Sequence, residues 1–188
     1  MLSLACVDYQ ENDLGDYNEV SIALFVHLRG QGPTLPYAGT AAALMRGRLA
    51  TYIHRLPVDQ SFSRDVGAGI WGFPKTVETI DMSIEGDRCR CRLICDGEHV
   101  LTMTGPVGGS RALPESEMVT YTYMDGRLHA TRFVSGANGV GVRLGGSTVE
   151  LGNHPIADEL RSLGLPKRPL MSLWMESMYG RFDGPTPV

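Results

Sequence analysis

Lys75 ends the most aromatic short run of the sequence, GIWGFPK at residues 69–75. If this run is extended, Trp71, Phe73 and Lys75 share one face, because side chains alternate along a strand. Aromatic rings beside the amine would exclude water, and burial disfavours a charged ammonium relative to a neutral amine. A neutral amine can attack a carbonyl carbon and form an imine. The run therefore predicts a nucleophilic lysine, with a surface lysine lying over the rings or in a cation–π contact as the alternative.

A second group of candidate residues lies in a strand expected at residues 17–30. One face of this strand is apolar throughout, whereas the other carries Glu19, Ser21, Ala23, Phe25 and His27. A carboxylate and an imidazole among small and aromatic residues fit the lining of a cavity, and a solvent-exposed edge is the alternative. In a cavity, Glu19 could carry protons, Phe25 and His27 could contact a substrate, and His27 could meet a negative charge. Arg29 and Arg55 are weaker candidates for that last role.

Three cysteines and a histidine raise the question of a zinc site: Cys89, Cys91, Cys95 and His99. The alternation of apolar and charged residues around them indicates a strand with these residues on one face. Residues two apart on a strand lie about 6.7 Å apart, whereas sulfur ligands of tetrahedral zinc lie under about 4 Å from each other. We therefore expect free, buried thiols and no metal, with zinc or a disulfide as the alternatives.

A glycine cluster at residues 136–146, GANGVGVRLGG, could be compared with a phosphate-binding loop. Such a loop follows a strand and opens a helix. Here the following residues, STVELG, continue as a strand. The cluster therefore predicts turns and bulges, with a phosphate loop as the alternative.

The composition is that of an ordinary globular domain. The chain has 188 residues, of which 43% are hydrophobic and 20% charged, so we expect a single domain over residues 1–188. The formal net charge of -4, with scattered basic residues, argues against nucleic acid as a partner. No apolar run is long enough for a membrane helix, and the first residues lack the basic start of a signal peptide. We expect no membrane association and a cytoplasmic location.

Short strand-like segments separated by glycine dominate the chain, so a β-rich α+β fold is expected. The segments are residues 17–30, 47–59, 75–105, 118–133 and 139–152, with hairpin turns at residues 85–87 and 96–97. One clear helix is expected near the C-terminus. It would be capped by Asn153 or His154, start at Pro155 and end at Gly164, with Ile156, Leu160 and Leu163 on one face. Residues 60–69 could add a short helical turn.

Two motifs together resemble the acetoacetate decarboxylase family. They are GFPK at residues 72–75, which matches the family's G-x-P-K element, and YNE at residues 17–19, which matches a Tyr-x-Glu on a preceding strand. The resemblance is strongest over residues 14–80 and returns weakly at residues 154–165 and 173–182. It implies curved, mostly antiparallel sheets, a β-cone or double barrel, around an interior pocket. In that pocket Lys75 would be the Schiff-base lysine, Glu19 the carboxylate and Phe73 a wall residue.

The sequence departs from the family pattern at three places. Thr76 stands where many members carry a second lysine. In acetoacetate decarboxylase itself, the usual example of such activation, the charge of the second lysine activates the first. Gly67, Ala68 and Gly69 stand where the family has Gly-Arg-Glu. The chain is also shorter at its N-terminus than the family's decarboxylases, so a substrate-binding arginine from that region has no obvious counterpart here. Burial alone would then have to activate Lys75.

The resemblance and the residues together predict a Schiff-base lyase that needs no cofactor and acts on a small keto or oxo acid. An iminium can accept electrons from loss of carbon dioxide, from aldol cleavage or from removal of an α-proton, and the sequence leaves these open. The alternative is a ligand-binding protein of the same fold without turnover. Edges of short strands need cover, and apolar residues gather at 170–182, so a homo-oligomer is expected.

Overall fold

The computed structural model describes residues 1–31, 50–166 and 168–188. Most strands belong to one nine-stranded sheet. Its main order is β1 (Leu2–Tyr9), β2 (Tyr17–Val26), β3 (Ala50–Val58), β8 (Arg111–Met124), β9 (Arg127–Leu144) and β11 (Met171–Trp174). β4 (Lys75–Val77) pairs with β3, while β12 (Ser177–Phe182) and β13 (Thr186–Pro187) pair with β9. Pairing is antiparallel except where β3 meets β4 and β8.

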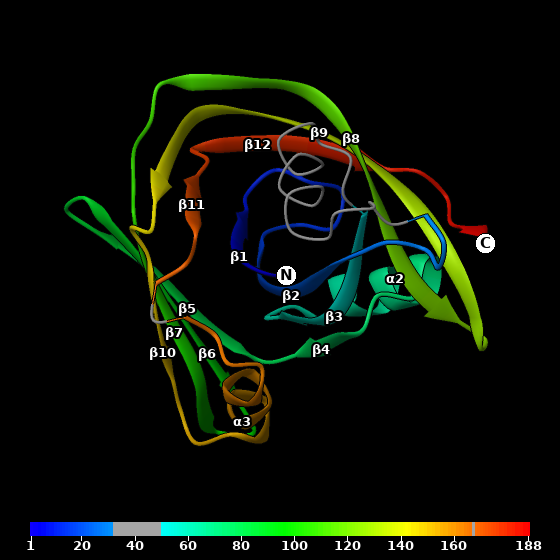
Figure 1. Cartoon of the computed structure of the whole chain (residues 1–188), viewed down its shortest axis with the longest axis horizontal. Helices are drawn as coiled ribbons and strands as arrows, with labels where there is room; N and C mark the ends of the chain where they lie inside the picture. The colour runs from blue at the N-terminus through cyan, green and yellow to red at the C-terminus, as the bar shows by residue number, and fades with distance from the viewer. Residues whose placement is uncertain (32–49, 167) are drawn as a thin grey trace.

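The second sheet has four antiparallel strands, in the order β10 (Thr148–Leu151), β7 (Glu98–Pro106), β6 (Arg88–Cys95) and β5 (Thr79–Glu85). Figure 1 shows the larger sheet curling, with β8 and β9 as a long arched pair and the smaller sheet on the other side of the molecule. The expectation of a β-rich α+β fold with curved, mostly antiparallel sheets is confirmed.

Most strands and both hairpin turns follow the sequence pattern, but the break expected at residues 134–138 is wrong, because β9 continues from Arg127 to Leu144. The predicted turns fall between β5 and β6 and between β6 and β7, where Gly86 and Gly97 have positive φ angles of 59° and 78°. Residues 47–49, at the start of the predicted strand 47–59, lie outside the described residues. β1 and the three C-terminal strands were not predicted, because each is short or lacks regular alternation.

The hydrophobic core lies where the smaller sheet packs against β2 and α3 (Pro155–Ser162). Its buried members are Val20, Ile22, Ile80, Cys91, Leu93, Cys95, Val100, Leu101 and Leu160. Val20 and Ile22 belong to the face of β2 that the sequence marks as apolar. Residues alternate along the strand, so Tyr17 and Glu19 lie on its opposite face. The core therefore fixes one face of β2 and leaves the other for a site.

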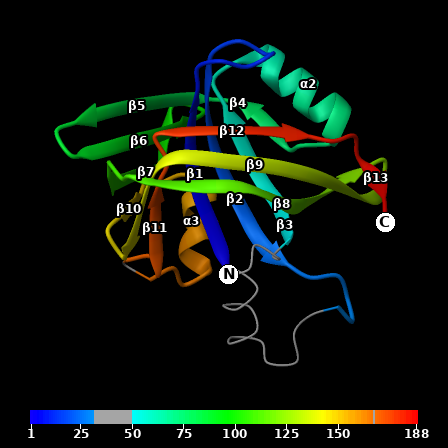
Figure 2. The same cartoon turned by 90° about the horizontal axis from the view of Figure 1, so that it is seen from above.

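The structure contains a longer second helix than the sequence predicts. A short helical turn was expected at residues 60–69. The structure instead has a full helix there, α2 (Ser61–Trp71), of 11 residues. Two interior glycines lower its helix propensity and hide it from a sequence pattern. Figure 2 shows α2 beside β4, so tertiary packing stabilises it. α3 matches its prediction, with His154 as N-cap and Pro155 at its start, although Leu163 is exposed.

The glycine cluster and the cysteines are structural. Residues 136–144 lie within β9, so neither the expected turns nor the phosphate-loop alternative is present there, and Gly145 and Gly146 follow the end of the strand. All four cysteines are free, and Cys91 and Cys95 are buried as expected, while Cys89 is half-buried. The His99 ring shares a hydrogen bond of 2.9 Å with Thr102. Neither helix in the described part of the chain is long and apolar enough to cross a membrane.

Candidate active site

The backbone turns sharply at Gly72, the first residue of the G-x-P-K element. Gly72 follows the last residue of α2 with a left-handed φ of 64°, and its N–H donates to the carbonyl of Ala68. A Cβ there would overlap Met124 Cγ and would lie 3.0 Å from the carbonyl oxygen of Tyr123. Glycine is therefore required both by conformation and by close packing. The turn directs the chain from the helix into β4, whose first residue is Lys75.

The expected extended run through Trp71, Phe73 and Lys75 is wrong. Trp71 is the last residue of α2, so it does not share a strand face with Lys75. Trp71 instead stacks on Phe73, with ring centroids 5.7 Å apart, and both rings contact Phe182 of β12. The Trp71 indole N–H donates to the carbonyl of Asp183 at 2.8 Å. These aromatic residues attach the motif to the C-terminal strand, and Phe73 is buried.

Lys75 and Glu19 meet across β3. Glu19 of β2 lies opposite Val58, and Lys75 of β4 lies opposite Leu56. Val58 and Leu56 are two residues apart, so both partners project from the same face of the sheet. Lys75 Nζ lies 3.0 Å from Glu19 Oε2, and the two side chains are 4% and 9% exposed. The structure thus brings these two predicted site residues together in a buried ion pair.

Three further residues, which were not among the predicted site residues, surround this ion pair. Lys75 Nζ donates a hydrogen bond of 2.8 Å to Ser63 Oγ of α2. It also lies 5.0 Å from the centre of the Tyr17 ring, a cation–π distance. The Tyr9 hydroxyl, on β1, donates to Glu19 Oε1 at 3.5 Å, and the rings of Tyr9 and Tyr17 stack. Tyr17 belongs to the Tyr-x-Glu motif and could have been found there; no local pattern marks Ser63 or Tyr9.

Burial is the largest influence on the ionisation of Glu19. It raises the pKa of this carboxyl above 4.5, and the opposing effects of the Lys75 charge and the hydrogen bonds from Lys75 and Tyr9 do not cancel it. Burial likewise raises the pKa of Tyr9, and the nearby Glu19 charge adds to that effect. Glu19 therefore holds protons more readily than an exposed glutamate. A carboxylate of that kind, touching an amine, can exchange a proton with it.

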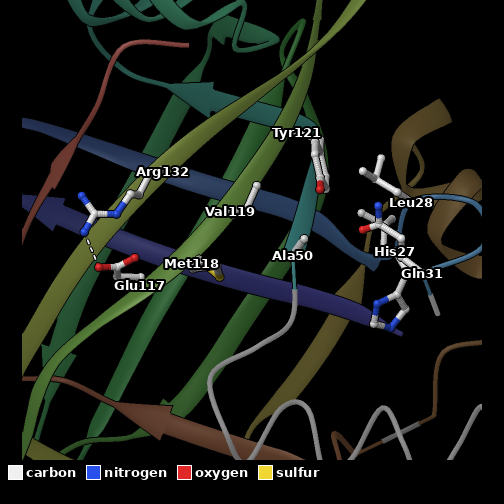
Figure 3. A pocket seen from close by; sticks show the side chains of 10 residues that line it. His27, Leu28, Gln31, Ala50, Glu117, Met118, Val119, Tyr121 and Arg132 are labelled. Atoms are coloured by element: carbon white, nitrogen blue, oxygen red, sulfur yellow. Dashed lines mark hydrogen bonds and ion pairs between the residues drawn. The ribbon is translucent and has the colours of Figure 1, made fainter. Parts of the chain in front are cut away.

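Phe25 and His27 lie farther along β2 and are not brought to the ion pair. His27 follows the last residue of β2, about 26 Å from Glu19 at the usual rise per residue. It lines a hollow of 460 Å³ together with Val26, Leu28, Gln31, Ala50, Glu117, Met118, Val119, Tyr121 and Arg132. Figure 3 shows the Arg132 and Glu117 ion pair at the end of this hollow away from His27. Neither Lys75 nor Glu19 is among its described lining residues.

The structure also places Arg55 and Arg29, the weaker candidates for meeting a negative charge on the substrate. Arg55 donates to Glu159 Oε2 through Nε and Nη2, at 3.1 and 2.9 Å, so its charge is already paired. Arg29 is exposed, beyond the end of β2. Within the described residues, no group of three or more His, Cys, Asp or Glu side chains is arranged to hold a metal ion.

A family model described as Acetoacetate decarboxylase (ADC) matches residues 2–184, so the chain belongs to the acetoacetate decarboxylase family. No curated protein matches it in sequence.

Several solved structures share the fold of this chain. Acetoacetate decarboxylase from Legionella pneumophila is 17% identical with a TM-score of 0.62, and the match covers 93% of this chain and 68% of that one. An acetoacetate decarboxylase-like enzyme from Sphingomonas wittichii RW1 is 15% identical with a TM-score of 0.51, covering 93% and 69%. The enduracididine biosynthesis enzyme MppR, solved with pyruvate, is 13% identical with a TM-score of 0.51, covering 92% and 65%. At these identities the likeness establishes the fold.

Proposed function

We propose that this chain is a cofactor-free Schiff-base enzyme acting on a small keto or oxo acid, most simply as a decarboxylase-type lyase. The observation that carries the proposal is the buried contact of 3.0 Å between Lys75 Nζ and Glu19 Oε2, at the lysine of the family's motif. MppR, which has the same fold, was solved with pyruvate, and pyruvate is a small 2-oxo acid. That complex supports the proposed substrate class.

The first half of the reaction forms the imine. Glu19 accepts a proton from the Lys75 ammonium, which leaves a neutral amine beside a neutral acid. The nitrogen lone pair adds to the substrate carbonyl carbon, the π electrons move to oxygen, and Glu19 returns its proton to that oxygen. The nitrogen then loses a proton to Glu19. Glu19 passes this proton to the hydroxyl, which leaves as water while nitrogen and carbon form the protonated imine.

The second half uses the protonated imine as an electron sink. With a 3-oxo acid, the bond to the carboxylate breaks and its electron pair moves toward nitrogen, which gives carbon dioxide and an enamine. A proton drawn from solvent adds to the enamine carbon and restores the protonated imine, and water then releases the ketone and the lysine ammonium. With a 2-oxo acid, loss of an α-proton gives the corresponding enamine. Tyr9, held against Glu19, lies beside these proton transfers.

The test is reduction with borohydride in the presence of acetoacetate or pyruvate, followed by mass spectrometry. The sequence contains only two lysines, Lys75 and Lys167, so an adduct can be assigned by one peptide digest. We expect a reduced adduct on Lys75. Intact, unmodified Lys75 with both keto acids would reject the proposal.

The pH dependence of trapping follows from the raised pKa of Glu19. Below this pKa, Glu19 is protonated and cannot accept the lysine proton, so trapping declines as pH falls. Because burial raises the pKa above 4.5, the acidic limb of the trapping profile should have its midpoint above 4.5. The profile is measured as trapping rate against pH with pyruvate. A midpoint at or below the value of an exposed glutamate would contradict this role for Glu19.

Thr76→Lys should change the trapping rate by less than about twofold. An exposed charge interacts mainly with water and is screened by salt, so it has little effect on the buried Lys75 amine. Thr76 follows Lys75 on β4 and is exposed, whereas the Lys75 side chain is buried. The second lysine of the family pattern would therefore point away from the amine. The measurement compares trapping rates at neutral pH. A rate increase of about tenfold or more would show that a charge at residue 76 reaches Lys75.

One observation favours a binding protein without turnover. The Lys75 amine is closed in by Glu19, Ser63 and Tyr17, and its side chain is 4% exposed. A carbonyl can reach the nitrogen only if neighbouring side chains move. A complex with pyruvate that forms without a reducible adduct would support this second candidate.

A further inference from the structure

We infer that α2 positions the reactive amine of Lys75. Ser63 holds the Lys75 nitrogen by a hydrogen bond, and Gly67 leaves space for the aliphatic part of the Lys75 side chain, so both are positioning residues. This inference rests on the proposed function, since it names how the same site is assembled. It goes beyond the motif, because neither residue belongs to the G-x-P-K or the Tyr-x-Glu element. Both lie on α2, one helical turn apart.

Ser63 is fully buried and faces the amine. Its Oγ accepts the hydrogen bond of 2.8 Å from Lys75 Nζ. Glu19 takes a second N–H at 3.0 Å, so two fixed acceptors define the rotation about the Cε–Nζ bond. When Glu19 removes its proton, the Ser63 bond still holds the nitrogen. It thereby fixes the direction in which the new lone pair points.

Gly67 is buried under the lysine stem. A Cβ on Gly67 would lie 2.9 Å from both Cδ and Cε of Lys75 and 3.5 Å from Nζ. Contacts under 3.0 Å are not tolerated, so a methyl group there must displace the stem. The Gly67 carbonyl also accepts the N–H of Phe73 at 3.2 Å, which ties the residue two before Lys75 to the same helix turn. The helix backbone is thus the surface against which the lysine lies.

Gly69 provides the matched control. It is also an interior glycine of α2, but no atom lies within 4 Å of a Cβ added there. Both Gly67→Ala and Gly69→Ala gain helix propensity, so a loss confined to Gly67→Ala must come from the contact with Lys75. Ser61, exposed on the same helix, is the corresponding control for Ser63.

The experiment measures borohydride trapping with pyruvate and thermal unfolding for Ser63→Ala, Gly67→Ala, Ser61→Ala and Gly69→Ala. We expect the trapping rate to fall at least about tenfold in Ser63→Ala, as for loss of a charge-assisted hydrogen bond, and similarly in Gly67→Ala. The acidic limb of trapping should also move in Gly67→Ala, because the amine is displaced from Glu19. Both controls should stay within about twofold of the wild type. A wild-type rate and profile in both site variants would overturn the inference.

A second readout does not depend on the reaction. Protein labelled with ¹³C at lysine Cε gives signals from only two lysines, and relaxation reports the order of each side chain. Ser63→Ala should lower the order parameter of the Lys75 Cε methylene, and Ser61→Ala should not. An unchanged order parameter in Ser63→Ala overturns the positioning role, whether or not keto acids are trapped. Absence of adduct in the wild type, with the order parameter lowered as expected, rejects the proposed chemistry alone.

Discussion

Lys75→Arg should abolish formation of a reducible adduct with pyruvate or acetoacetate. A guanidinium stays protonated at all accessible pH values and has no lone pair for attack on a carbonyl. It keeps a positive charge for Glu19, so the buried carboxylate is not left unpaired, and the fold should survive. The measurement is the trapped fraction by mass spectrometry, with circular dichroism to check folding. We expect the trapped fraction to drop to background.

Lys167→Arg is the matched control for this experiment. Lys167 is the other lysine of the sequence, and the same replacement there leaves Lys75 intact. Trapping should match the wild type. Persistent adduct in folded Lys75→Arg protein would show that another amine reacts, and the catalytic reading of the motif would then fail.

Glu19→Gln should reduce the trapping rate by about 100-fold to 10,000-fold, the range for loss of a positioned acid or base. The amide keeps the shape of the side chain but cannot accept the proton of the Lys75 ammonium. The same change leaves a buried ammonium without its counter-ion. Removal of one partner of a buried ion pair lowers the free energy of unfolding by about 3 kcal/mol or more. Urea unfolding at neutral pH measures this loss, and trapping at the same pH measures the first effect.

Glu159→Gln supplies the comparison for Glu19. Glu159 also pairs with a cation, Arg55, at 2.9 Å, but both side chains are more than a third exposed. A pair of that exposure contributes about 0 to 1 kcal/mol, and it lies outside the contacts of Lys75. Stability should change little and trapping not at all. Equal effects of the two substitutions would mean that Glu19 acts only through general electrostatics.

Sequence periodicity predicted most strands because burial on one face of a strand selects apolar residues at alternate positions. Val20 and Ile22 on β2 show this, as do Cys91, Leu93 and Cys95 on β6. The hairpin turns were equally local, since glycine is needed where φ is positive. α2 was underestimated for the opposite reason: Gly67 and Gly69 oppose a helix locally, and packing against β4 compensates.

The sequence by itself determined the family, the β-rich fold and the two residues of the ion pair, because Lys75 and Glu19 lie in short motifs with fixed local spacing. Tertiary structure alone decided what surrounds them. Ser63, Gly67 and Tyr9 come from α2 and β1, and their contacts with the pair depend on how strands pair and how the helix packs. Tertiary structure also placed Trp71 at the end of α2, off the strand that carries Lys75, and kept His27 away from the amine through the length of β2. Alternation along a chain fixes which face a side chain occupies, but contacts between distant segments depend on the packing of the whole molecule.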